Sequence, residues 1–464
     1  MKRKMKKKTL INISRKTFFQ VTSLLVSLLF FSIILTYVVP KGTFGTLTDG
    51  STDYLTYIPR SDIKGIGLLK GIFAPVLVFF SSDGLTLIML SLFLFVISAS
   101  FQVMNDAGGI RAIVESVSSR FRQRRNALLV IISFLFYCFG AFLGLFEEML
   151  TMLPIVVALC ISVGFDSFTG FICSILACGF GFAGAITNPF TVLLASEIIG
   201  VNPLVNIWFR ILIFIVMFGL LMVFLFRHTK SIEKSVNEEV QEEINESPAD
   251  NRRLRRIYSV FLLAALAMII VVSMISSVRS YAVVILTAYF LIFGLIAGIL
   301  ATGSARTAFS SFGRGILGAL PTIVFIAFAA SIKFVFEEGG IMPTIVHQIN
   351  NLVMGKSPVM VALAIYLIVL LLEFFISSST AKAILVMGIL AMVNTGLTKE
   401  MLVLLYTFGD GYTNVIFPTS PVLLISLSMI EMDYFKWVKK GAPLFVANLL
   451  LVVGFIVLGV VIGY

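Results

Sequence analysis

The chain has 464 residues and a formal net charge of +11. Hydrophobic residues make up 59% of it and charged residues only 13%, whereas soluble domains contain about 45–50% and about 25%. A soluble fold cannot bury that much apolar surface. The composition therefore excludes a soluble enzyme, a disordered chain and a disulfide-rich secreted scaffold, and it predicts a polytopic membrane protein.

The positive charge is concentrated at the N-terminus, in residues 1–17. Eight of the first sixteen residues are Lys or Arg, which predicts a cytoplasmic N-terminus lying against anionic lipid rather than a nucleic-acid-binding site. The apolar run 18–39 that follows is long enough to cross a bilayer and carries no small-residue cleavage site. We therefore expect a retained anchor in a bacterial cytoplasmic membrane.

The first half of the chain, residues 18–226, contains two unusual apolar segments. One, at about 126–163, meets an acidic pair midway and is too short to cross twice, so it predicts a re-entrant helical hairpin. The other, at about 168–199, is interrupted at Thr187-Asn188-Pro189. A Pro after an Asn inside an apolar span predicts a broken helix.

A polar linker is expected at 227–257 and a connecting transmembrane helix at 258–275. The second half, 281–464, then follows the same plan, with a hairpin at about 359–393 and a broken helix at about 401–430. The expected fold class is all-α, with nine crossings, two hairpins and an outward-facing C-terminus.

The two halves share one spacing. Glu147 precedes Thr187-Asn188 by 40 and 41 residues, and Glu373 precedes Thr413-Asn414 by the same intervals. The connecting helix reverses the orientation of the second half, so the pattern predicts an inverted repeat. Inverted repeats with discontinuous helices place a substrate site at their interface near the bilayer midplane. The sequence therefore predicts a secondary transporter rather than a channel or an intramembrane protease.

Carboxylates inside a membrane cost about 2.5–3.5 kcal/mol each on insertion scales, so they indicate function. Those predicted at the break points are Glu147, Glu148, Glu373 and Asp410. Together they are typical of a cation site. The alternative is that they lie in water at a hairpin tip or pair with Lys333 or Lys382.

Polar residues accompany the acids. The run Ser377-Ser378-Ser379-Thr380 predicts hydroxyl and backbone donors for a carboxylate at the second hairpin tip. Asn188 and Asn414 are predicted either to coordinate Na⁺ or substrate or simply to cap broken helices. Lys382 requires an acidic partner or a substrate carboxylate, and it could stand where a sodium ion would.

No prosthetic cofactor is expected. The four Cys residues lie in or beside apolar segments, and neither His has a second ligand at metal spacing. The only coupling species that we consider are Na⁺ and H⁺.

Several motifs resemble the YfcC family of the anaerobic dicarboxylate carrier group. They are Phe146-Glu147-Glu148, Thr187-Asn188-Pro189-Phe190, Ser377-Ser378-Ser379 and 408–414, FGDGYTN. The resemblance implies the ion transporter superfamily, an elevator motion of a hairpin-bearing domain, and a homodimer. It also implies a substrate- or ion-binding site at Glu147, Glu148, Thr151, Thr187, Asn188, Ser377, Ser378, Ser379, Thr380, Asp410, Thr413 and Asn414. Lys382 departs from the small or amide residue of the family pattern, and we include it in the site.

The same resemblance implies two substrate classes. Some relatives are regarded as arginine/ornithine antiporters, and the group name indicates four-carbon dicarboxylates coupled to Na⁺ or H⁺. A dianion would require Arg or several donors, and the sequence places no Arg near either hairpin tip. The acidic pair and Asp410 favour a cationic amino acid whose α-carboxylate binds the hydroxyl run.

Overall fold

The computed structural model describes residues 15–46, 52–60, 62, 64–82, 84–121, 123–233, 252–275, 278, 281–341, 343–344, 347, 356–376, 379–392 and 395–464. Within these residues, nine helices are long and apolar enough to cross a membrane. They include the first arm of each predicted hairpin, Arg125–Leu143 and Pro358–Phe375. Neither predicted broken helix is among the nine, because each is divided into short pieces.

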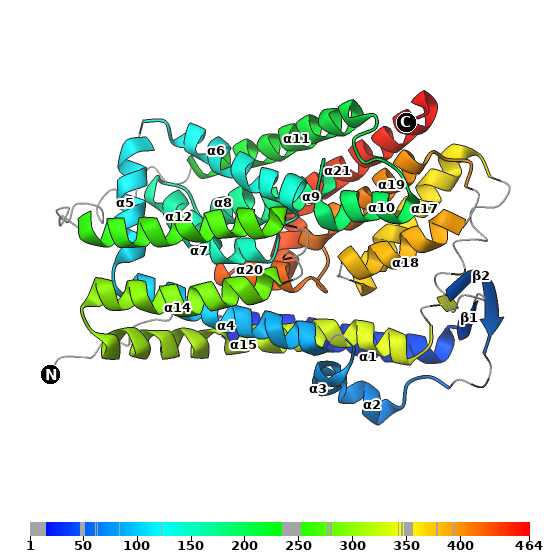
Figure 1. Cartoon of the computed structure of the whole chain (residues 1–464), viewed down its shortest axis with the longest axis horizontal. Helices are drawn as coiled ribbons and strands as arrows, with labels where there is room; N and C mark the ends of the chain where they lie inside the picture. The colour runs from blue at the N-terminus through cyan, green and yellow to red at the C-terminus, as the bar shows by residue number, and fades with distance from the viewer. Residues whose placement is uncertain are drawn as a thin grey trace.

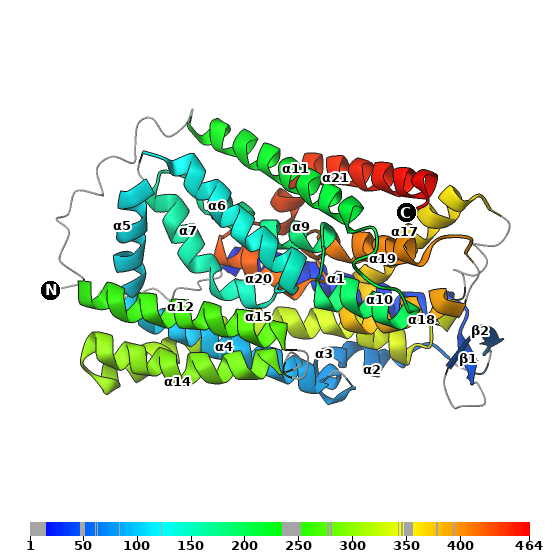
Figure 2. The ribbon, with the colours of Figure 1, turned by 45° about the horizontal axis from the view of Figure 1, so that its top comes forward.

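Long helices form one layer of the molecule. They are α1 (Arg15–Val38), α4 (Gly84–Asp106), α12 (Arg252–Met274), α14 (Ala282–Thr302) and α15 (Ala305–Glu338). Figures 1 and 2 show α4, α14 and α15 side by side. Small residues allow this close approach: Ser98 Oγ donates to the Gly315 carbonyl at 2.8 Å, and Ser100 Oγ donates to the Phe290 carbonyl at 2.7 Å.

A small antiparallel hairpin of strands follows α1, whereas the sequence analysis predicts an all-α fold. It consists of β1 (Gly42–Thr46) and β2 (Thr52–Pro59). The short elements α2 (Leu68–Ile72), α3 (Ala74–Leu77) and η1 (Val78–Phe80) then precede α4. Among the residues that the structure describes, these two strands are the only ones, and they lie at one end of the helical layers (Figure 1).

The second layer contains the hairpins and broken helices. After α5 (Gly109–Phe121), which links the layers, the first half contributes α6 (Arg125–Cys138), η2 (Phe139–Leu143), η3 (Glu148–Thr151), α7 (Leu153–Ser162), α8 (Ser167–Phe171), η4 (Ile172–Leu176), α9 (Ala177–Ala183), η5 (Pro189–Leu193), α10 (Leu194–Ile199) and α11 (Ile207–Glu233). The second half contributes α17 (Pro358–Phe375), α18 (Ser379–Met392), α19 (Lys399–Gly411), η6 (Tyr412–Val415), α20 (Pro421–Met429) and α21 (Tyr434–Ile462).

The two helical hairpins enter this layer from opposite ends of the molecule (Figure 2). The open end of α6 and α7 lies against α5, whereas α18 contacts β2 at the other end. Opposite entry is what an inverted repeat requires. The equivalence of the two halves as repeats stays a prediction.

Several helices are longer than the apolar runs that predicted them. α11 extends to Glu233 and α12 begins at Arg252, so both reach into the expected polar linker. α21 begins at Tyr434, where the Asp433 carboxylate accepts from the Phe435 and Lys436 amides. Hydropathy marks only the lipid-facing part of a helix, whereas capping and charged side chains allow it to continue into water.

The two broken helices cross where they are interrupted. Gly411, at the end of α19, lies so close to α9 that an added Cβ would come within 2.4 Å of the Ala183 Cα and N atoms. Gly181 of α9 approaches the first hairpin in the same way, since its Cβ would lie 2.2 Å from the Tyr137 carbonyl oxygen. Glycine is thus required for contact between these backbones.

We predict that Gly411→Ala separates the broken helices and lowers the thermal unfolding midpoint of the detergent-purified protein. The added methyl group meets backbone, which cannot move aside as a flexible side chain can. The control is Gly454→Ala in α21, where an added Cβ meets nothing within 4 Å. That control should be neutral or slightly stabilising. Equal midpoints for the two variants would contradict the packing argument.

Candidate functional site

A buried ionic cluster joins the second hairpin to the second broken helix. The Lys382 ammonium of α18 contacts the Glu373 carboxylate of α17, and its Nζ lies 2.6 Å from Asp410 Oδ1 of α19. All three side chains are at most 2% exposed. Two carboxylates thus share one ammonium in a region that excludes solvent, and the cluster carries a charge of −1 when all three groups are ionised.

Polar neighbours form hydrogen bonds with this cluster. Ser379 Oγ donates to Asp410 Oδ2 at 2.9 Å, and Lys382 Nζ also donates to the Ile376 carbonyl at 3.3 Å. The Tyr406 hydroxyl donates to the Ser379 carbonyl. These bonds connect the start of α18 to the end of α19, so displacement of either element would disturb the charges.

The second break lies directly beyond Asp410. Here Asn414 Nδ2 donates to the Asp410 carbonyl at 3.0 Å, and Thr413 Oγ1 donates to the Gly409 carbonyl at 3.0 Å. Ser420 then caps α20 by accepting from the Leu423 amide. Both predicted residues therefore support the interrupted backbone, and their part in substrate or ion binding stays a prediction.

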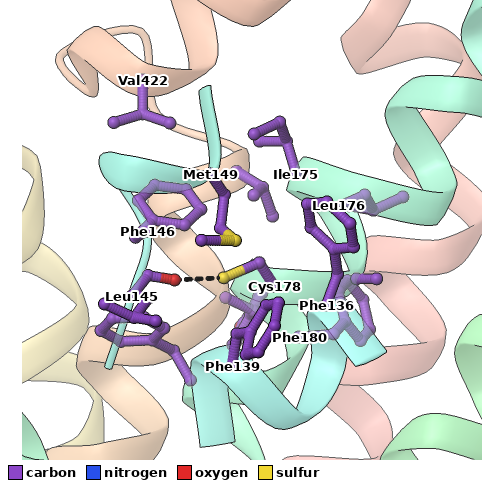
Figure 3. Close-up of a cluster of buried hydrophobic side chains, with 14 of the residues drawn as sticks. Phe136, Phe139, Leu145, Phe146, Met149, Ile175, Leu176, Cys178, Phe180 and Val422 are labelled. Carbon is purple, nitrogen blue, oxygen red and sulfur yellow. Dashed lines mark hydrogen bonds between the residues drawn. The ribbon is translucent and has the colours of Figure 1, made fainter. Parts of the chain in front are cut away.

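The first hairpin tip carries the predicted acidic pair. Glu147 is partly buried, and Glu148 is 9% exposed at the start of η3. Their apolar neighbours fix the loop: Phe146 and Met149 pack into a cluster with Val422 of α20 (Figure 3). In the same cluster, the Cys178 thiol donates to the Leu145 carbonyl at 2.5 Å, so this cysteine serves packing, as expected.

The first break is stabilised by Asn188. Its Oδ1 accepts from the Phe190 and Thr191 amides at 2.9 and 3.2 Å, and its Nδ2 donates to the Gly140 carbonyl at 2.9 Å. Gly144 has a φ of +68° and leaves no room for a Cβ beside Asn188 Oδ1. Asn188 therefore caps η5 and holds it against the first hairpin, as the capping alternative predicts.

The structure brings most of the predicted residues to the crossing of the two breaks. Thr187 Oγ1 donates to the Phe142 carbonyl at 3.3 Å, and Thr151 is fully buried behind the acidic tip. α18 also packs against α10 and η5. Ser377 and Ser378 lie outside the described residues, as does the Thr380 side chain.

Two participants were absent from the predicted site. Glu373 was recognised as an intramembrane acid but was left out of the site, although its spacing in the repeat marks it. Arg210 of α11 is not predicted from the sequence: it is 3% exposed, and its Nη1 donates to the Ala185 carbonyl at 3.3 Å, two residues before Thr187. The prediction concerned the hairpin tips, and Arg210 lies instead beside the first break, because α11 packs against α9.

The match to known proteins covers almost the whole chain. The model of the C4-dicarboxylate anaerobic carrier family, DcuC, matches residues 18–461. The chain belongs to this family. Within the DcuC family, it is 27% identical over 413 residues to YfcC of Escherichia coli (strain K12), which is named as a candidate basic amino acid antiporter; the match covers 82% of this chain and 81% of YfcC.

Further comparisons give more distant similarities. A protein of Haemophilus influenzae described as uncharacterised is 24% identical over 383 residues, which cover 79% of this chain and 74% of that one. The solved YdaH transporter of Alcanivorax borkumensis covers 96% of this chain and 99% of its own, with a TM-score of 0.47 and 16% identity. MtrF of Neisseria gonorrhoeae covers 94% of both chains, with a TM-score of 0.41 and 12% identity.

Family membership confirms several predictions. The chain is a multi-pass membrane protein of a transporter family and not an enzyme. Its substrate is accordingly a small molecule. The expected absence of a prosthetic cofactor stays a prediction. A role for Na⁺ at Asn188 or Asn414 stays a prediction.

The charge balance of the cluster predicts an order of stabilities. Lys382→Gln should be the most destabilising single change, by about 3–5 kcal/mol, because it leaves two buried carboxylates without a cation. Glu373→Gln should be milder, because the Lys382–Asp410 pair that remains is neutral. The measurement is the thermal unfolding midpoint in detergent at neutral pH.

Lys356 is exposed and lies two residues before α17, so Lys356→Gln serves as the matched control for these variants. The deficit of Lys382→Gln should also shrink as the pH falls, because protonation neutralises the two acids. A larger loss for Glu373→Gln than for Lys382→Gln would contradict this assignment of charges.

Proposed function

We propose that this protein exchanges cationic amino acids, such as arginine and ornithine, across the cytoplasmic membrane. The observation that carries the proposal is the Lys382 ammonium held between Glu373 and Asp410. A site that binds one buried ammonium is chemically suited to bind a second one supplied by a substrate. The name of YfcC, a relative across four-fifths of the chain, supports the same class.

Lys382 gives the exchange a physical basis. When substrate leaves, Glu373 and Asp410 would otherwise remain as unpaired buried carboxylates, which is costly. Lys382 takes the place of the departing cation and keeps the empty site close to neutral. The substrate ammonium or guanidinium then displaces Lys382 on binding, with no requirement for Na⁺.

Substrate orientation follows from the rest of the site. The α-carboxylate is expected at the hydroxyl run that begins α18, and Ser379 is its described member nearest the acids. Glu147 and Glu148, at the other hairpin tip, add negative potential on the approach from the first half of the chain. Such a field attracts cationic solutes and repels dianions.

Alternating access is proposed to occur by an elevator motion. The hairpin-bearing layer would slide against the layer built on α4, α14 and α15, which would also provide the surface for a homodimer. The two-layer arrangement and the opposite entry of the hairpins support this motion (Figure 2). The cytoplasmic position of the N-terminus belongs to the same proposal and rests on its basic residues.

One alternative substrate class rests on specific observations. A four-carbon dicarboxylate, coupled to Na⁺ or H⁺, agrees with the description of the DcuC family. It would use Lys382 and Arg210 as its cationic partners, and protons or Na⁺ would neutralise Glu373 and Asp410. The acids outnumber the buried cations around the breaks, which is why we favour the cationic substrate.

Counterflow in proteoliposomes tests the choice. Vesicles preloaded with unlabelled ornithine should accumulate labelled arginine without Na⁺, and preloaded succinate should drive no uptake of labelled succinate. Asp410→Asn should abolish the exchange, while Lys356→Gln should retain it. Uptake of succinate alone, driven by Na⁺ or a proton gradient, would contradict the proposal of a cationic amino acid substrate.

The role of Lys382 has a separate test. Lys382→Gln should lower arginine exchange in Na⁺-free buffer by about tenfold or more, because hydrogen bonds to charged groups contribute about 1.5–3 kcal/mol each. External Na⁺ should restore part of the rate by occupying the vacated cation position. If the variant transports arginine normally and its response to Na⁺ is unchanged, Lys382 is not a substitute cation.

A further inference from the structure

A cavity of about 340 Å³ lies between α11 and α21, away from the crossing of the breaks. Figure 2 shows these two helices side by side on one outer face of the molecule. Both are long, apolar spans, so this face contacts lipid. The cavity is therefore open to the membrane rather than to the transport site.

The cavity is lined by apolar residues at one end and by basic residues at the other. Its apolar part includes Val223 and Phe224 of α11 and Leu444 of α21, and its other end includes Arg227 and Lys440. Val223 is 49% exposed in spite of its position deep in the span. An apolar channel with a basic end has the shape and charge of a phospholipid with an anionic headgroup.

The basic end lies where headgroups are expected. Arg227 and Lys440 are near the C-terminal end of α11 and the N-terminal end of α21, beside the loop between α7 and α8. These are the ends that the pattern of basic residues assigns to the cytoplasm. Basic pockets between transmembrane helices on that side bind anionic lipid headgroups.

The Asp166 carboxylate lies near this basic end and already has hydrogen-bond partners. Asp166 Oδ1 lies 3.0 Å from His228 Nε2 and accepts from the Thr169 amide and hydroxyl at 2.8 and 2.6 Å. Burial raises the pKa of the Asp166 carboxyl, but the bonds from His228 and Thr169 outweigh it and bring this pKa to about 2. The charge of Asp166 acts on Lys440, but the lining residues of the cavity include two cations, Arg227 and Lys440, and no carboxylate.

Lys440 is held in place for this role. Its Nζ lies 4.0 Å from the centre of the Phe168 ring, a cation–π contact, and the side chain remains exposed. Arg227, one turn before Ser231 on the same face of α11, presents a planar guanidinium that suits a phosphate.

We propose that this cavity binds one anionic phospholipid, with its phosphate at Arg227 and Lys440 and an acyl chain along Val223, Phe224 and Leu444. The site is independent of the substrate class proposed above. It would bind lipid in every state of the transport cycle in which α11 and α21 stay together.

Native mass spectrometry of the full-length protein provides the test, with phosphatidylglycerol and phosphatidylcholine of identical acyl chains. The wild type should bind the first phosphatidylglycerol more tightly than phosphatidylcholine. Each basic residue near an anionic headgroup contributes about 1 kcal/mol, so the Arg227→Gln/Lys440→Gln variant should lose about 30-fold in phosphatidylglycerol affinity. Lys436→Gln/Lys439→Gln removes the same charge from exposed positions at the same end and should retain the preference.

A third variant tests the apolar part of the cavity. Ala447→Trp, at its apolar end, should weaken the binding of both lipids while the charges remain. Equal binding of the two lipids by the wild type, or full displacement of phosphatidylglycerol by millimolar inorganic phosphate, would overturn the proposal. So would a protein dimer that dissociates in Ala447→Trp, because a second copy would then be the occupant.

Discussion

A helix that stops partway across a membrane leaves backbone N–H and C=O groups that hydrocarbon cannot satisfy, and each unsatisfied group costs several kcal/mol. This constraint governs the second layer of the protein. Asn188 satisfies two amides at the first break, and Asn414 and Thr413 satisfy carbonyls at the second. The breaks are also placed against each other, at Gly411 and Ala183, where protein rather than lipid surrounds them. Interrupted helices are possible here only because two of them share one buried crossing.

The same crossing lowers the cost of buried charge. Lys382, Glu373 and Asp410 come from three helices that meet only because the second hairpin turns beside the second broken helix. Without that turn, each charge would face lipid or an apolar core alone. Backbone capping and charge pairing are therefore coupled: a motion that opened the hairpin would expose both the carbonyl ends and the carboxylates. A substrate that supplies its own cation would offset the electrostatic part of that cost.

Much of this arrangement could be predicted from the sequence. The positions of both hairpins and both breaks follow from apolar length, Pro and the equal spacing from Glu147 and Glu373. Lys382 was correctly expected to need an acidic partner. Arg210 could not be found, because its contact with Ala185 joins separate helices and leaves no periodic signal. The sequence also predicts some helix ends incorrectly, because hydropathy indicates only which residues contact lipid. The start of α21 instead depends on capping by Asp433. The strands β1 and β2 lie in a polar stretch where no apolar pattern applies.

Each half of the chain places acidic residues in its hairpin, and the residues around those acids differ between the two halves. At the tip of the first hairpin, Glu147 and Glu148 stand beside apolar anchors, Phe146 and Met149, and the nearby break is capped by a neutral amide. In the second hairpin, Glu373 is instead paired with the ammonium of Lys382. A symmetric site would hold acids on both sides and would require two external cations. With Lys382 between Glu373 and Asp410, the second half needs fewer cations from solution to neutralise its buried acids. Under the exchange proposed above, an incoming cationic solute takes the place of this ammonium.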